Sequence, residues 1–229
     1  MSTEQSLVMA RSAPASSKLP DTAHSQILRE TTAPPSLGES FDLFVTRRRI
    51  AISLLLFSTI LAIDVLLLDV RPRNLLNFTD IGTICGWVGV ILGLALRSWS
   101  AGTLHKNAVL TQIGPYSITR NPLYVGSFLM MLGFCSLVHD MHTIWIVAGP
   151  MAWIYWVQVK QEERLLSRLY PQDWNSYAAT TPRFIPRPWN PVRGGNWSLA
   201  QWARNREYKA IVASAIGLVG LWAWHVFTW

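Results

Sequence analysis

Charged residues are scarce in this chain of 229 residues: Asp, Glu, Lys and Arg make up 14%, whereas hydrophobic residues make up 50%. A soluble domain carries roughly a quarter of its residues as charges, so this balance is typical of a membrane protein. Acidic residues are the rarer kind, 13 against 20 Lys and Arg, and the net charge is +7. Because anionic lipids of a cytoplasmic leaflet attract such a basic excess, it requires no nucleic-acid partner.

Cysteine is also rare, and Cys85 and Cys135 both lie in predicted apolar helices. They suggest no disulfide framework, and the five histidines show no metal-ligand spacing, so the sequence predicts no metal site. A Gly-rich strand-to-helix fingerprint is absent, which argues against a soluble dinucleotide-binding domain. Residues 1–40 are rich in Ser, Thr, Ala and Pro and lack the apolar run of a signal peptide, so we expect a disordered tail there.

Long apolar runs dominate the remainder of the chain. A bilayer core about 30 Å thick requires roughly 20 apolar residues per helical span. The third run is short, about 24 Å at 1.5 Å per residue, and a tight turn separates it from the fourth, so these two are expected to form a short helical hairpin. We therefore predict an all-α polytopic membrane protein with about five transmembrane helices, as one domain over residues 41–229. The predicted spans are about 50–68, 81–99, 123–138, 141–160 and 208–229, with a cytoplasmic cap over 161–206.

Basic residues are distributed unevenly about these spans. Eighteen of the twenty Lys and Arg fall in the N-terminal segment, in residues 97–120 or in residues 160–209, and only Arg71 and Arg73 fall on the other side. The positive-inside rule therefore predicts a cytoplasmic N-terminus and an external C-terminus. In a bacterium the membrane would be the inner, plasma membrane.

Two features inside the spans allow more than one interpretation. The second span contains Gly82/Gly86 and Gly89/Gly93, each pair one helical turn apart, and such small residues are expected to let another helix approach closely. Asp64 is the one acid well inside a span, which makes it a candidate functional group. It also lies about one turn from the end of its span, so an interfacial position explains it equally well.

The segment "GPYSITRNPLYVG", residues 114–126, lies where the third apolar run begins. Its Gly-Pro and Asn-Pro pairs each predict a turn, and Pro122 is favourable at the first position of a helix. The start of that helix presents unpaired N–H groups and a positive dipole end, which suit a carboxylate or hydroxyl of a small molecule. Its tyrosines offer ring faces for stacking, and Arg120 offers a planar, positively charged guanidinium. The same residues are also typical of an anchor at the membrane interface.

Three stretches occur in order between about residues 95 and 188: "LRSWSAGTL", "GPYSITRNPLYVGSF" and "QEERLLSRLYPQDWNSYAATTPRFIPR". Together they resemble the isoprenylcysteine carboxyl methyltransferase family and its bacterial relatives, within the wider superfamily of membrane phospholipid methyltransferases. The resemblance implies an enzyme that binds S-adenosyl-L-methionine in a cytoplasmic cofactor pocket and accepts a lipid-like substrate from the bilayer. Many relatives have histidine where this chain has Asn121, so a titrating role is lost at that position. The cofactor-binding residues implied are Gly114, Tyr116, Arg120, Asn121, Pro122, Tyr124, Glu162 and Glu163.

Glu162 and Glu163 follow the fourth apolar run. Because neighbours on a helix point about 100° apart, the two carboxylates are not expected to share one task. Taken without the resemblance, a solvated helix end with Glu163 paired to Lys160 explains them more simply. With the resemblance, at least one glutamate is expected in the site. In the polar stretch that follows, Arg183 and Arg187 are expected to hold either a substrate carboxylate or a lipid phosphate. The predicted catalytic residues are Arg120, Glu163 and Arg183.

Methyl transfer from a sulfonium is an in-line displacement, so the protein mainly aligns donor and acceptor and excludes water. A carboxylate acceptor is already ionised at neutral pH, whereas an amine would require Glu162 or Glu163 as a base. We therefore expect carboxyl O-methylation of a lipophilic, prenylcysteine-like acid. Phospholipid N-methylation is the alternative reaction, and a non-catalytic membrane scaffold is the alternative of another class. The expected partners are the lipid-like methyl acceptor and membrane lipids.

Overall fold

The computed structural model describes residues 70–105, 109–186, 191–192 and 194–228, together with Thr59 and Ile63. All of them belong to the unit Asp42–Trp229, and the unit Met1–Phe41 contains no described residue. The predicted tail, Asp64 with the rest of the predicted first span apart from Thr59 and Ile63, and Arg187 all lie outside the described residues. The regular elements within the described ranges are all helical, which agrees with the predicted class. They are α4 (Ile81–Thr103), η2 (Gly114–Ser117), α5 (Pro122–Val138), α6 (Met141–Ile146), η3 (Val147–Met151), α7 (Ala152–Leu169), α8 (Pro171–Thr180), α9 (Leu199–Arg204) and α10 (Tyr208–Thr228).

Two of the described helices are long and apolar enough to cross a membrane: α4, and residues Tyr208–Phe227 of α10. α5 is a shorter apolar helix. Only 22% and 6% of the apolar windows of α4 and α10 are buried within the protein, whereas the core helix of a soluble protein would be mostly buried. Side chains as large as Ile81 and Phe227 are 72% and 87% exposed. The exposed apolar surface of both helices supports an integral membrane protein.

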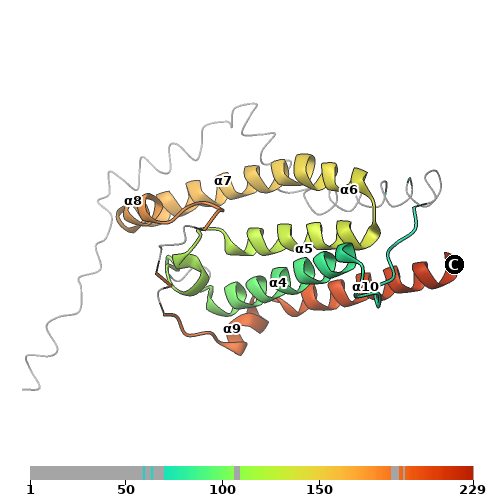
Figure 1. Ribbon diagram of the computed structural model, residues 1–229. Helices are drawn as coiled ribbons and strands as arrows, with labels where there is room; N and C mark the ends of the chain where they lie inside the picture. The colour runs from blue at the N-terminus through green and yellow to red at the C-terminus, as the bar shows by residue number, and fades with distance from the viewer. Residues whose placement is uncertain are drawn as a thin grey trace, which may run out of the picture. The chain divides into compact units, whose positions relative to one another are not determined.

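Glycines bring α4 and α5 into backbone contact along their length (Figure 1). A Cβ added at Gly89 would lie 2.9 Å from the Cα of Gly133, and one added at Gly133 would lie 2.6 Å from the backbone nitrogen of Val90. The predicted packing role is thus confirmed for three of the four α4 glycines, because only a residue without a side chain fits there. Gly82 instead lies beneath the side chain of Arg73. The contact is formed by Gly86, Gly89 and Gly93 on α4 and by Gly126 and Gly133 on α5.

The buried core lies between α4, α5 and α10, which run side by side in Figure 1. The segment before α4 closes one end of it. Arg73 donates its backbone N–H to the carbonyl oxygen of Leu137 at 2.9 Å and pairs its guanidinium with Asp80 at 2.7 Å. Asp80 also caps α4 by accepting from the backbone N–H of Thr83 at 3.0 Å. The core residues are Leu75, Val90, Leu137, Val138 and Leu221.

The predicted fourth span, 141–160, is not one regular helix. α5 ends at Val138, and its C-cap residue His139 has a φ of 64°, which reverses the chain. The next helical segment consists of α6, the π-helical turn η3 and α7. Pro150 lies within the π turn, and because proline lacks an N–H it interrupts the regular hydrogen-bond ladder. α7 then continues to Leu169, beyond the predicted end of the span.

The region around α9 covers the C-terminal end of α4. The side chains of Gln201 and Asn205 donate to the carbonyl oxygen of Leu104 at 2.6 Å and 3.0 Å. The guanidinium of Arg97 forms an ion pair with Glu207 at 2.7 Å, and Glu207 is only 4% exposed. Because the last carbonyl groups of a helix lack partners within it, these contacts stabilise the end of α4.

Candidate functional site

The turn that precedes α5 depends on a glycine at its first position. Gly114 has a φ of 59°, and a Cβ there would lie 3.2 Å from the side chain of Thr103. Both the left-handed conformation and the close contact favour glycine. The turn is tied to α8, because the hydroxyl of Tyr177 donates to the carbonyl oxygen of Tyr116 at 2.8 Å.

Tyr116 places a buried hydroxyl in this turn. Its side chain is 7% exposed, and among the described residues its hydroxyl has no hydrogen-bond partner. Burial raises the pKa of Tyr116 far above its usual value, so the phenol stays protonated at neutral pH. Tyr116 therefore offers one unused donor next to α5.

Residues 119–121 are fastened to the loop after α8, which is about sixty residues away in the sequence. The backbone N–H of Arg120 donates to the carbonyl oxygen of Pro182 at 2.9 Å. Both Thr119 and Asn121 donate from their side chains to the carbonyl oxygen of Arg183, at 3.0 Å and 3.1 Å. These bonds bring Arg183 against the start of α5.

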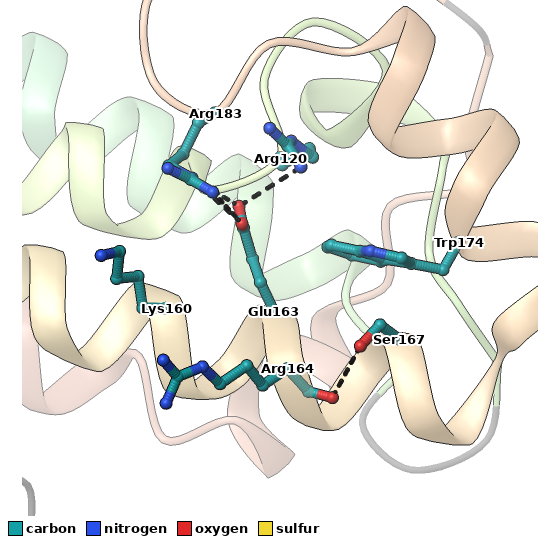
Figure 2. Close-up of a pocket in the computed structure, with 7 residues that line it drawn as sticks. All are labelled: Arg120, Lys160, Glu163, Arg164, Ser167, Trp174 and Arg183. Atoms are coloured by element: carbon teal, nitrogen blue, oxygen red, sulfur yellow. Dashed lines mark hydrogen bonds and ion pairs between the residues drawn. The ribbon is translucent and has the colours of Figure 1, made fainter. Parts of the chain in front are cut away.

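Glu163 of α7 lies at the centre of a charged cluster formed by these segments, as Figure 2 shows. The guanidinium of Arg183 donates from Nε to Oε1 at 3.1 Å and from Nη2 to Oε2 at 2.7 Å. Asn121 donates to Oε1 at 3.2 Å, and Nη1 of Arg120 lies 3.6 Å from Oε1. The hydrogen bonds to Glu163 raise the pKa of the Arg183 guanidinium. Glu163 is only 7% exposed, so this cluster fixes the position of both arginines. The pairing of Glu163 with Lys160 that the residues alone suggested is replaced by these arginine contacts.

Glu162 points elsewhere, as expected for neighbours on a helix. It accepts from the hydroxyl of Tyr124 at 2.6 Å and from the side-chain amide of Gln158 at 3.2 Å. These donors are neutral, and in the described part of the chain no cation forms an ion pair with Glu162. Gln158 is 9% exposed and its side-chain oxygen has no partner among the described residues. Within the part of the chain that the structure describes, the hydrogen-bond partners of the Glu162 carboxylate are thus neutral groups.

A pocket of about 310 Å³ opens beside the arginine–glutamate cluster (Figure 2). Four of the side chains that line it are cations, and Glu163 is its one acid. The guanidinium of Arg120 lies 5.7 Å from the centre of the Trp174 ring, a distance at which a cation is attracted to an aromatic face. The pocket is lined by Arg120, Lys160, Glu163, Arg164, Ser167, Trp174 and Arg183.

The structure brings most of the predicted site residues into one region. Arg120, Glu163 and Arg183 meet at the pocket, and Asn121 contacts them. Glu162 and Tyr124 form a neighbouring hydrogen-bonded pair. The other three predicted residues, Gly114, Tyr116 and Pro122, lie in the turn and at the first position of α5.

The sequence did not identify Lys160, Arg164 and Ser167 as pocket residues, nor Gln158 as the partner of Glu162. The signal was present in the helical spacing, because residues three and four apart lie on one face of a helix. Residues 160, 163, 164 and 167 follow this spacing on α7. Among the described residues, no group of three or more His, Cys, Asp and Glu side chains is arranged to hold a metal ion.

Comparison with known proteins places these residues within a known family. Residues 81–173 match the family described as phospholipid methyltransferase. The chain is 31% identical over 156 residues to the cobalt-zinc-cadmium resistance protein CzcN of Cupriavidus metallidurans, an alignment that covers 67% of this chain and 71% of the relative. It is 32% identical over 165 residues to the nickel-cobalt-cadmium resistance protein NccN of Alcaligenes xylosoxydans xylosoxydans, covering 70% of this chain and 73% of the relative. No solved structure matches the chain.

Proposed function

This chain belongs to the same protein family as the two resistance proteins and carries a phospholipid methyltransferase domain, and from that premise we propose that it is an S-adenosyl-L-methionine-dependent methyltransferase of the membrane. The proposed reaction is carboxyl O-methylation of a lipophilic, prenylcysteine-like acid. The observation that carries this choice is the pair Arg120 and Arg183, held by Glu163 at the wall of a pocket with a cationic lining. The proposal places this pocket on the cytoplasmic side, where the basic residues gather.

The residues near α5 and α7 fit the charges of the methyl donor. S-adenosylmethionine carries a sulfonium, an ammonium and a carboxylate, and when bound it supplies an electrophilic methyl group. Glu162, whose described partners are the neutral Tyr124 and Gln158, would attract the cationic groups. The hydroxyl of Tyr116 and the side-chain oxygen of Gln158, which have no partner among the described residues, would supply further hydrogen bonds. The Arg120 guanidinium would hold the carboxylate of the methyl donor.

An acid suits the pocket better than an amine for two reasons. Its cations attract an acceptor carboxylate and repel an ammonium group. The oxygens of Glu163 already accept hydrogen bonds from Arg183 and Asn121, so they are not directed at an acceptor proton. A carboxylate acceptor requires orientation but no base, and the guanidinium of Arg183 would provide that orientation while Arg120 holds the methyl donor.

Phospholipid N-methylation is the second candidate, and the description of the matched family favours it. An amine acceptor must lose a proton before it attacks. Glu162 would be the base in that case, because its described hydrogen-bond partners are neutral and it is exposed.

Methyl transfer with two acceptors tests the proposal. Purified protein would be incubated with methyl-labelled S-adenosylmethionine and either a prenylcysteine-like acid or phosphatidylethanolamine. We expect label that becomes volatile on treatment with base, as for a methyl ester, and its loss in Arg120→Ala. Base-stable label on the amine would establish the N-methylation alternative. Transfer to neither acceptor, together with no cofactor binding by the folded protein, would favour a non-catalytic scaffold.

A further inference from the structure

The guanidinium of Arg183 is held along one of its edges by Glu163. Its Nε and Nη2 atoms donate to the two carboxylate oxygens, at 3.1 Å and 2.7 Å. Nη1 forms no hydrogen bond with the described residues, so the edge made by Nη1 and the second N–H of Nη2 is left for a ligand. Two parallel N–H groups on one edge match the two oxygens of a carboxylate. The contact with Glu163 fixes the position of the guanidinium but leaves it able to tilt about the shared edge.

Trp156 of α7 covers a face of the same guanidinium. The Cζ atom of Arg183 lies 4.9 Å from the centre of the Trp156 ring, a distance at which a cation is attracted to an aromatic face. Trp156 also packs against Phe184, the next residue of the loop, with ring centres 6.0 Å apart. Arginine stacks on aromatic rings through the flat face of its guanidinium, so this contact opposes the tilt that Glu163 leaves free. The carboxylate and the indole together leave one edge of the guanidinium exposed in one orientation.

A tryptophan at the membrane interface is the simpler explanation of Trp156. The residue is 41% exposed and lies near the end of the predicted fourth span, where tryptophans are typical. The ammonium group of Lys160 lies 5.5 Å from its ring, but Lys160 is four residues further along α7, so helical spacing alone accounts for that contact. The contacts with Arg183 and Phe184 are different, because they join α7 to the loop after α8. An anchor in lipid requires no such contact.

We propose that Trp156 is a positioning residue for methyl transfer, which holds the flat face of the Arg183 guanidinium and so aims its open edge at the carboxylate of the acceptor. This inference rests on the proposed function, in which Arg183 orients that carboxylate. Trp156 does not line the pocket, so it acts through Arg183. A fixed orientation matters because in-line displacement requires the acceptor oxygen to be aligned with the methyl group. A fixed edge also favours an acid over its carboxamide, which has only one acceptor oxygen and no charge.

The test is a calorimetric titration of the full chain in a neutral detergent with saturating S-adenosylhomocysteine. The ligands are an N-acetyl-S-prenylcysteine and its carboxamide, and the wild type should bind the acid about tenfold more tightly. In Trp156→Leu the affinity for the acid should fall about fivefold, as loss of a cation–π contact implies, and the affinity for the carboxamide less than twofold. Trp156→Phe keeps a ring and should retain the acid affinity within about twofold. Methyl-transfer kinetics should show a KM for the acid raised about fivefold in Trp156→Leu, at an unchanged KM for S-adenosylmethionine.

Two controls separate positioning of Arg183 from loss of structure or of lipid contact. Trp145→Leu makes the same substitution at a 73% exposed tryptophan of α6, over whose ring no cation of the described residues lies, and should change the acid affinity less than about twofold. In an Arg183→Gln background, Trp156→Leu should have little further effect, because its role passes through Arg183. Circular dichroism would verify that each variant is folded.

The outcomes also separate this inference from the proposed function. If the wild type did not bind the acid, the proposed acceptor would be wrong, and the role of Trp156 would be refuted with it. If the wild type bound the acid, three results would overturn the role of Trp156 alone. They are equal losses for acid and carboxamide in Trp156→Leu, an equal loss in Trp145→Leu, and an undiminished effect of Trp156→Leu in the Arg183→Gln background.

Discussion

Replacement of Glu163 by glutamine should destabilise the fold, whereas the same replacement of Glu162 should not. Glu163→Gln keeps the shape of the side chain but leaves the guanidinium groups of Arg120 and Arg183 without their counter-charge. A hydrogen bond to a charged group contributes about 1.5–3 kcal/mol, and loss of one partner of a buried ion pair costs about 3–5 kcal/mol. Arg183 is 32% exposed and glutamine still accepts one hydrogen bond, so we expect a smaller loss, about 2 kcal/mol in the free energy of unfolding.

Glu162→Gln is the matched control, because it removes the same charge one residue away. Glu162 is exposed and its described donors are neutral, so its replacement should change the free energy of unfolding by less than about 0.5 kcal/mol. Thermal unfolding in detergent, followed by circular dichroism, should show a midpoint lowered by about 4–8 °C for Glu163→Gln and by little for Glu162→Gln. In the same preparations, the affinity for S-adenosylmethionine should fall about tenfold in Glu162→Gln. Equal midpoints for the two variants, or a larger loss of stability in Glu162→Gln, would refute the division of roles between the two carboxylates.

Three further predictions concern the scaffold, and thermal unfolding measures each of them. Gly133→Ala should lower the free energy of unfolding by about 1–3 kcal/mol because its Cβ would meet the α4 backbone. Gly220→Ala, with open space around it, should not destabilise the protein, and equal effects of the two variants would contradict the close packing of α4 and α5. A double-mutant cycle to alanine should give an interaction free energy of about 2 kcal/mol between Arg97 and Glu207. If the effects of the two single variants on the free energy of unfolding simply added, the ion pair would not be stabilising. Gly114→Ala should cost about 1–2 kcal/mol because of its positive φ and reduce cofactor affinity, and an unchanged midpoint would show that the turn tolerates a side chain.

The starts of the long helices could be predicted because local residues determine them. α4 begins at the predicted residue, directly after the Asp80 cap, and α5 begins with Pro122, within one residue of the predicted start. The ends were harder to predict. α4 continues past residue 99 to Thr103, where side chains of the α9 region bond to its last carbonyl groups. Such partners lie about a hundred residues away, so no local pattern indicates them.

The chemistry of the site could be predicted only in part. The residues at the start of α5 were identified by their turn pattern and by a family resemblance, but their attachment to the loop at Arg183 depends on long-range hydrogen bonds. The sequence indicated that Glu162 and Glu163 diverge, yet it did not indicate which one meets the arginines. That choice depends on the rotation of α7 about its axis, which is set by packing of the whole helix, including the contact between Tyr124 and Tyr155. Arg164 was missed because an exposed cation near a helix end is usually just solvated.

The most direct test of the proposed function is calorimetric titration of the purified, folded full-length chain with S-adenosylhomocysteine. We predict saturable binding of one molecule per chain, and weaker binding in Arg120→Ala at unchanged secondary structure. A flat titration with protein that unfolds cooperatively would contradict the proposal that the start of α5, together with α7 and the loop at Arg183, holds a methyl donor.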